Sequence, residues 1–177
     1  MFHVPCSMII LGVDPGTATT GYGIIKIKNQ KSKIKNNGKD LELIDYGCII
    51  TKPDIDTSGR LLDLFKRLKR IIKKYKPDMM AVEDIFFFKN LKTAIKVSQA
   101  RGVILLIGEQ AKLSIFEYTP LQVKQSVVGY GRAEKRQVQK MVKILLKLKD
   151  IPKSDDAADA LAIAICCAHS ASSRLGN

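Results

Sequence analysis

The chain has 177 residues, enough for one domain with a sizeable core, and its 46% hydrophobic and 27% charged residues are ordinary for a globular protein. Its 30 lysines and arginines against 17 acidic residues leave a formal net charge of +13, which favours a polyanionic partner, nucleic acid before an anionic membrane surface. No apolar run approaches the roughly 18 residues that a membrane-spanning helix needs. Met1 to Ser7 lack the apolar stretch of a secretion signal, so we expect a cytoplasmic protein with no membrane partner.

The first part of the chain predicts three consecutive strands. Met8–Val13 is a continuous apolar run that ends in Asp-Pro-Gly, typical of a buried strand closed by a turn. We expect a second strand over Gly21–Ile27 and a third over Leu41–Thr51, with a hairpin at Asn37 and Gly38 between them. The lysines around residues 28–40 belong either to a solvated hairpin tip or to a DNA contact.

Helices and strands alternate along the rest of the chain. Apolar residues recur at helical spacing over Thr57–Lys76, where lysines and arginines fill the other face, and Pro77 ends this helix. Further elements are expected in chain order: a strand over Met79–Val82, a long helix over Asn90–Lys112, a strand over Ser114–Tyr118, a helix from Thr119 to the glycines at 129 and 131, and helices over Ala133–Leu148 and about Ser154–His169. This order predicts an α/β fold with a mixed five-stranded sheet flanked by helices. We expect a single domain over residues 1–177.

Acidic residues follow two of the expected strands. Asp14 ends the first strand and is followed by Pro15 and Gly16, and Glu83 ends the fourth strand. Open α/β sheets usually build their sites at such strand ends. A lone carboxylate in this position can also simply cap a turn or a helix.

The last helix carries further carboxylates. Asp156 and Asp159 are three residues apart and share a helix face, but Asp155 and Asp159 are four apart and share one as well, so spacing does not choose between Asp155 and Asp156. Ser154 as an N-cap, with both aspartates favourable to the helix dipole, is the purely structural interpretation. The Ala-rich stretch after Asp159 is suited to close packing against a sheet, which would hold these carboxylates beside the strand ends.

Carboxylates without a Cys or His partner favour hard cations such as Mg²⁺ or Mn²⁺. Packed together, four such groups would repel one another unless cations neutralise them. Two ions about 4 Å apart can activate a water molecule and stabilise the leaving oxygen of a phosphodiester. The charge of the chain and the type of site therefore both indicate a metal-dependent nuclease.

The motifs resemble those of the RuvC-type Holliday junction resolvases, a branch of the ribonuclease H-like nucleases. The matching stretches are ILGVDPG at 10–16, TGYG at 20–23, AVE at 81–83, QARGV at 99–103, VKQSVVG at 123–129 and DAADALAIA at 156–164. They run in order over about residues 8–169, the expected core of the domain. The resemblance implies the ribonuclease H-like version of the predicted fold.

The resemblance also assigns a site and a reaction. It implies that Asp14, Glu83, Asp156 and Asp159 bind two Mg²⁺ ions per subunit, with Mn²⁺ as a substitute, and it selects Asp156 over Asp155. The implied activity is resolution of four-way DNA junctions by symmetric nicking of two opposing strands, leaving 5′-phosphate and 3′-hydroxyl ends, in recombination and repair. A homodimer formed through the helix from Asn90, and cooperation with the RuvA–RuvB branch-migration complex, are implied as partners.

Candidate DNA contacts flank the glycine break at residues 129–131. Helix N-termini and glycine-rich backbone favour phosphate oxygens, and the resemblance places Lys124 and Lys135 near the scissile phosphate, although most lysines are simply solvated. Arg132 and Arg136 in the same segment are further candidates. Phe86 matches a position that inserts at the junction centre, where it would stack on a base, and core packing is the alternative.

The chain departs from the family pattern in three places. Met1 to Ser7 precede the usual start, the lysine-rich segment around residues 28–40 is longer, and Asp84 adds negative charge beside Glu83, where a neutral residue is common. An actin-like ATPase or sugar kinase is a competing interpretation, because Asp14, Gly16 and Thr17 also resemble their first phosphate loop, but those enzymes need two such domains. A branched-DNA-binding protein without catalysis is another, and chelation of the metal would distinguish it from a nuclease.

Overall fold

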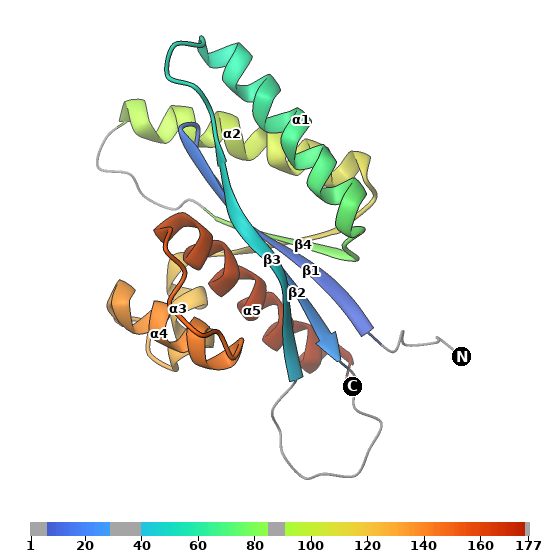
Figure 1. Cartoon of the computed structure of the whole chain (residues 1–177), viewed down its shortest axis with the longest axis vertical. Coiled ribbons are helices and arrows are strands. Elements are labelled where there is room, and N and C mark those ends of the chain that lie inside the picture. The colour runs from blue at the N-terminus through green and yellow to red at the C-terminus, as the bar shows by residue number, and fades with distance from the viewer. Residues whose placement is uncertain (1–6, 29–39, 85–90, 176–177) are drawn as a thin grey trace.

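The apolar runs of the sequence form one five-stranded sheet with helices on both faces (Figure 1). The computed structural model describes residues 7–28, 40–84 and 91–175. The strands are β1 (Ser7–Asp14), β2 (Thr19–Lys28), β3 (Asp40–Ile50), β4 (Met79–Glu83) and β5 (Ser114–Tyr118). The helices are α1 (Thr57–Tyr75), α2 (Leu91–Gln110), α3 (Pro120–Val128), α4 (Lys135–Leu145) and α5 (Asp155–Leu175).

These elements confirm the predicted α/β fold and its order. Most predicted bounds differ from the observed ones by one or two residues. The largest differences lie in the last two helices: α4 is shorter than predicted, and α5 continues past His169 to Leu175. The predicted hairpin at Asn37 and Gly38 lies outside the described residues, as does Phe86. No helix in the described part of the chain is long and apolar enough to cross a membrane.

The strand order is β3-β2-β1-β4-β5. The first three strands are antiparallel neighbours, whereas β4 and β5 are reached by helical crossovers and lie parallel to β1. In this register Val13 pairs with Val82, so Asp14 and Glu83 leave the sheet at the same end. Asp14 also lies opposite Gly21 of the antiparallel strand β2.

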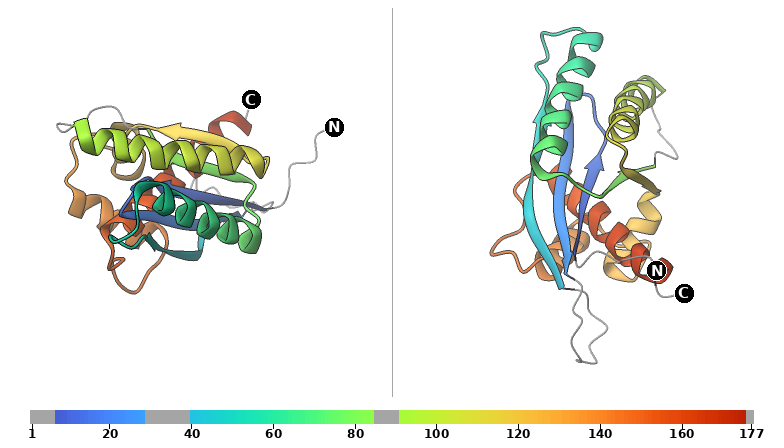
Figure 2. Two further views of the ribbon diagram at one scale, coloured as in Figure 1. Left: turned by 90° about the horizontal axis from the view of Figure 1, so that it is seen from above. Right: turned by 90° about the vertical axis from the view of Figure 1, so that its right-hand side faces the viewer.

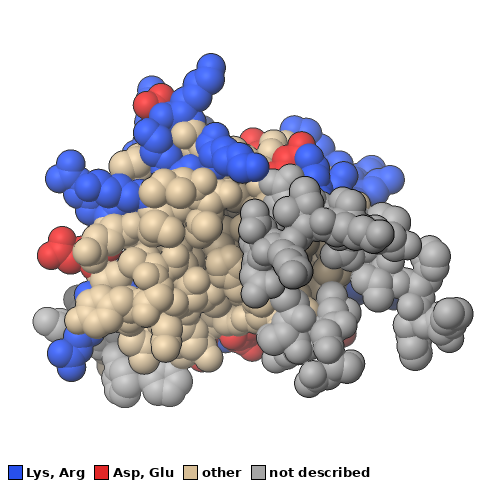
Figure 3. All heavy atoms as spheres, turned by 90° about the horizontal axis from the view of Figure 1, so that it is seen from below, with Lys and Arg blue, Asp and Glu red and all other residues tan. Residues whose placement is uncertain are grey.

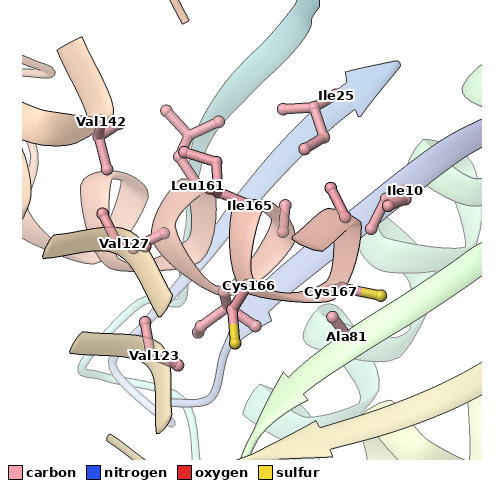
Figure 4. Close-up of a cluster of buried hydrophobic side chains, with 14 of the residues drawn as sticks. Ile10, Ile25, Ala81, Val123, Val127, Val142, Leu161, Ile165, Cys166 and Cys167 are labelled. Atoms are coloured by element: carbon pink, nitrogen blue, oxygen red, sulfur yellow. The ribbon is translucent and has the colours of Figure 1, made fainter. Parts of the chain in front are cut away.

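The helices form one layer on each face of the sheet. Helices α1 and α2 cover one face, and α5 crosses the other face with α3 and α4 packed outside it (Figures 1 and 2). Each face therefore has its own apolar core. In the core under α5, Leu161 and Ile165 lie between the sheet residues Ile10 and Ile25 and the outer helices (Figure 4).

Helix α5 lies unusually close to the sheet because both surfaces are made of small residues. Ala157, Ala160 and Ala164 are buried on the helix. A Cβ atom on Gly12 would lie 2.1 Å from the Ala160 carbonyl oxygen, and one on Gly21 would lie 2.0 Å from the Asp156 carbonyl oxygen. Only glycine allows this approach, which fixes the N-terminal turn of α5 over the strand ends.

Candidate active site

Three elements bring four carboxylates together at one end of the sheet. Asp14 ends β1, Glu83 ends the neighbouring strand β4, and Asp156 and Asp159 lie in the first turns of α5. We call these four residues the carboxylate cluster. The negative charges of all three others raise the pKa of Asp14, so Asp14 lies within electrostatic reach of each of them.

Burial and mutual repulsion perturb the cluster strongly. The pKa of Asp14 is raised to about 8, first by burial and then by the negative charges of Glu83, Asp159 and Asp156. Burial and the charge of Asp159 also raise the pKa of Glu83, while a hydrogen bond with the Asp14 side chain acts in the opposite direction. Carboxylates held in this way favour an arriving cation, which would relieve both the repulsion and the loss of hydration.

Lys135, the first residue of α4, supplies a positive charge at the edge of the cluster. Its Nζ lies 2.9 Å from Asp159 Oδ2 and 3.4 Å from Asp155 Oδ2. Burial lowers the pKa of Lys135, but the hydrogen bonds and charges of Asp159 and Asp155 outweigh it and raise the pKa overall. Burial raises the pKa of Asp159, and Lys135 opposes this shift.

Asp155 and Asp156 face different neighbours although they are adjacent in α5. The Asp155 carboxylate accepts a hydrogen bond from Gln139 Nε2 at 2.8 Å and pairs with Lys135, so it is directed toward α4. Asp156 lies over Gly21 and is the one whose charge raises the pKa of Asp14. The difference favours Asp156 over Asp155 as a member of the cluster.

A cavity of about 180 Å³ opens beside the cluster between α3, α4 and α5. Glu83 and Asp159 line it together with Lys124 and Lys135. The charge of Lys124 lowers the pKa of Glu83, so this lysine is within electrostatic reach of the carboxylates. The cavity thus presents both signs of charge, as a site for a phosphate held through cations requires.

The segment between α3 and α4 has the predicted break. Thr119 caps α3 with its side chain, and Gly129 ends α3 in the left-handed conformation at φ 80°, which favours glycine. Arg132 and Arg136 are exposed beyond this turn and form no ion pair with any described residue. Figure 3 shows a face of the molecule with several groups of Lys and Arg side chains along its outline and fewer acidic side chains.

The extra acidic residue Asp84 is compensated by a contact that the sequence did not reveal. Arg101 of α2 lies 3.2 Å from Asp84 and also pairs with Glu117 of β5. The Asp84 backbone N–H donates to the Tyr118 carbonyl at 2.8 Å. Asp84 is therefore tied to α2 and β5 rather than left as an uncompensated charge beside Glu83.

The residues present suit a hard divalent cation. Among residues 7–28, 40–84 and 91–175, no three His, Cys, Asp or Glu side chains already have the spacing of a complete metal-ligand set. The cluster nevertheless offers only oxygen donors. Burial first, and then the neighbouring negative charges, raise the pKa values of Asp14 and Glu83, and a bound cation would oppose both effects. A cation of the Mg²⁺ class fits this donor chemistry better than zinc, which favours nitrogen and sulfur ligands.

Comparison with known proteins gives a consistent set of relatives. The family model described as crossover junction endodeoxyribonuclease RuvC matches residues 10–167. The crossover junction endodeoxyribonuclease RuvC of Caldicellulosiruptor saccharolyticus is 56% identical over 168 residues, covering 95% of this chain and 96% of the relative. The solved structure of Thermus thermophilus RuvC superimposes with a TM-score of 0.83 at 31% identity, covering 96% of this chain and 97% of that one. The Thermus thermophilus RuvC in complex with a Holliday junction substrate has a TM-score of 0.81 at 29% identity, with the same coverage.

Proposed function

Because the chain belongs to the RuvC family of crossover junction endodeoxyribonucleases, we propose that its carboxylate cluster binds the divalent metal with which it cuts four-way DNA junctions. The reaction is endonucleolytic resolution of Holliday junctions. The observation that carries the assignment is the convergence of Asp14, Glu83, Asp156 and Asp159 beside a cavity lined by two lysines. Two Mg²⁺ ions per subunit are the proposed cofactors, and Mn²⁺ is the expected substitute.

Each residue of the site has a proposed task. When bound, the metal lowers the pKa of a water molecule and stabilises the charge on the leaving 3′ oxygen. Asp14, Glu83, Asp156 and Asp159 hold the cations at the strand ends and α5. Lys124 and Lys135 bind the non-bridging oxygens of the scissile phosphate, which places the phosphorus against the cluster. The products carry 5′-phosphate and 3′-hydroxyl ends.

Lys135 must leave its ion pair with Asp159 before it can bind the scissile phosphate. In the structure its ammonium pairs with Asp159 and Asp155. A cation bound by Asp159 would compete with this pair and leave Lys135 free to turn toward a phosphate, while Asp155 keeps it close. Arg132 and Arg136, exposed in the same region, are proposed to contact the backbone of a duplex arm.

We also propose a twofold homodimer formed through α2. The exposed face of this helix carries Leu91, Ile95 and Leu106, which are 74%, 52% and 54% exposed. A Cβ atom on Gly102 would meet nothing within 4 Å, so a second helix can approach closely there. A four-way junction is itself close to twofold symmetric, and a dimer offers one site to each of two opposing strands.

Membership of the family supports a proposal for the setting of the reaction. We propose that the protein acts in the cytoplasm, in recombination and repair, together with the RuvA–RuvB branch-migration complex. Phe86 is proposed to stack on a base at the junction centre.

The test is nicking of a labelled synthetic four-way junction. With Mg²⁺ the purified protein should nick two opposing strands and leave a linear duplex of the same sequence uncut, and ligase should seal the nicked products. EDTA should abolish nicking but leave junction binding in place. Equal nicking with EDTA, or equal cutting of the linear duplex, would overturn the proposal.

A further inference from the structure

A groove of about 860 Å³ runs from Asp156 along the edge strand β3. One wall is the outer strand of the sheet, and the other is the segment between α4 and α5. From β3 the groove is lined by Tyr46, Cys48 and Ile50, and from the segment between α4 and α5 it is lined by Lys149 and Lys153. The groove lies apart from the cavity that Lys124 and Lys135 line, since Asp156 lies on the groove and Glu83 and Asp159 on the cavity.

The second half of β3, from Tyr46 to Ile50, is an edge without charged side chains, because the register shift against β2 and the charged Glu42 and Asp45 lie nearer the start of the strand. Among the described strands β3 pairs with β2 alone, so no other described strand pairs with its outer side. Edge strands usually discourage association by means of charged side chains, proline or bulges. Here Tyr46 is 37% and Ile50 is 63% exposed. An aromatic and an apolar side chain on an open edge indicate a surface that something covers.

Positive charge lies on both sides of this edge. Lys149 and Lys153 are exposed on the far wall of the groove, where Asp150 is the one acidic lining residue besides Asp156. On the other face of the sheet, Arg67 and Arg70 of α1 line a recess of about 240 Å³ that also reaches Cys48. Aromatic surface between basic side chains is the combination that binds single-stranded nucleic acid, through base stacking and phosphate contacts.

We infer that this groove binds the nucleotides of the cut strand that adjoin the scissile phosphate. The inference rests on the proposed function, because it takes the carboxylate cluster as the place of cleavage. A strand whose phosphate lies on the cluster must continue past it, and the groove begins at Asp156. In this arrangement Lys149 and Lys153 contact backbone phosphates, and Tyr46 stacks on a base. The groove is thus a DNA subsite of this chain outside the cavity between α3, α4 and α5.

The thiol of Cys48 can be used to test whether DNA lies in the groove. Cys48 is a half-buried free thiol that lines the groove, 2.9 Å from Ser154 Oγ, whereas Cys166 and Cys167 are buried in the core. Junctions carrying a disulfide-activated tether at successive phosphates of the cut strand can therefore report which nucleotide lies there. The reaction is run in EDTA so that the DNA stays intact, with a Cys6→Ser background that removes the remaining cysteine.

The expected result is a cross-link within a few nucleotides of the cleavage position, lost in Cys48→Ser. Cross-linking at no position, or with equal yield at positions far out on the arms, would overturn the inference. Nicking of the same junction by the same protein in Mg²⁺ is measured separately. A protein that nicks normally but does not cross-link refutes only the claim that the groove binds the cut strand. A protein that does not nick in Mg²⁺ refutes the proposed function.

Substitutions provide an independent measure of the subsite. Tyr46→Ser should weaken junction binding in EDTA about tenfold, given the stacking contribution of one base, and Tyr46→Phe should keep wild-type affinity. Lys153→Gln should weaken binding more than Lys140→Gln, since Lys140 is also exposed, on α4, but lies outside the groove. A folded Tyr46→Ser protein that binds and cross-links like the wild type would contradict the proposed contact.

Discussion

At the scale of single residues, the site is defined by a conflict between burial and charge at Asp14. This carboxyl group lies among three other carboxylates, and its pKa is raised from 3.8 to about 8. The folded state therefore keeps a proton that the unfolded chain has released between these two pH values. The buried position of Asp14 consequently lowers the free energy of unfolding of the metal-free protein at alkaline pH. This is expected of a group that serves function rather than stability.

The stability of the metal-free protein should accordingly fall as the pH rises from about 4 to about 8. Asp14→Asn removes the group with the largest shift, so its stability should depend less on pH and exceed that of the wild type at pH 8.5. Urea unfolding in EDTA at pH 5 and pH 8.5 measures both effects. If the variant and the wild type lose stability in parallel over this range, Asp14 is not buried against its neighbours in the way described.

Asp155 and Asp156 form a matched pair for testing the metal site. Asp156→Asn should lower the nicking rate at least about a hundredfold with junction binding retained, because a lost metal ligand removes stabilisation of the transition state. Asp155→Asn removes the partner of Lys135 and Gln139 and should cost less than about tenfold. Single-turnover nicking at saturating protein gives both values. The same loss for both variants would contradict the assignment.

The sequence could predict some of these residues and not others. Asp14 and Glu83 were predictable because an apolar strand that ends in a carboxylate is visible locally. Spacing could not separate Asp155 from Asp156, since both share a helix face with Asp159. The pairing of Lys135 with Asp155 joins two helices, and that of Arg101 with Asp84 joins α2 to the end of β4. No local pattern contains contacts of this kind.

At the scale of elements, close packing of α5 on β1 and β2 positions half of the cluster. Asp156 and Asp159 belong to the same helix turns that rest on Gly12 and Gly21. The sequence indicated this contact through the Ala-rich stretch of the helix. The end of α5 was predicted six residues too early, at His169 rather than Leu175. Ala171 is buried beyond the expected end, and the Ser170 hydroxyl donates to the Cys166 carbonyl at 3.0 Å, so the helix keeps its packing there.

Gly21→Ala should damage the site without touching a carboxylate. The new Cβ would lie 2.0 Å from the Asp156 carbonyl oxygen, so the first turn of α5 must move away from the sheet. Overpacking of this kind costs about 1–3 kcal/mol, and we expect the nicking rate to fall further than the stability alone explains. Urea unfolding of the same variant gives the loss of stability with which the loss of nicking is compared. Normal nicking by a folded Gly21→Ala protein would show that the position of α5 is not critical.

At the scale of the whole molecule, charge and symmetry connect the site to its substrate. The net charge of +13 provides general affinity for DNA and makes it sensitive to salt. Net charge, visible in the sequence, says nothing about which faces meet the junction. The edge groove at β3 and the exposed face of α2 appear only once the strands are ordered and the helices are placed on the sheet.

The proposed dimer has a direct consequence for the reaction. If each subunit cuts one strand, a mixed dimer of wild type and Asp14→Asn should nick one strand and rarely resolve the junction into two linear duplexes. Native and denaturing gels of the same reaction separate these products, and ligase should seal the single nick. Efficient resolution of both strands by the mixed dimer would show that one site serves both.

The most direct test of the metal site is anomalous diffraction from crystals of the protein grown with a junction and Mn²⁺. Mn²⁺ is expected to replace Mg²⁺ and scatters anomalously, so the ions can be located without assuming their ligands. The prediction is two peaks within coordination distance of Asp14, Glu83, Asp156 and Asp159, next to the phosphate that is cut. Peaks elsewhere, or a strand bound at the cluster without metal, would contradict the claim that these four carboxylates form the catalytic metal site.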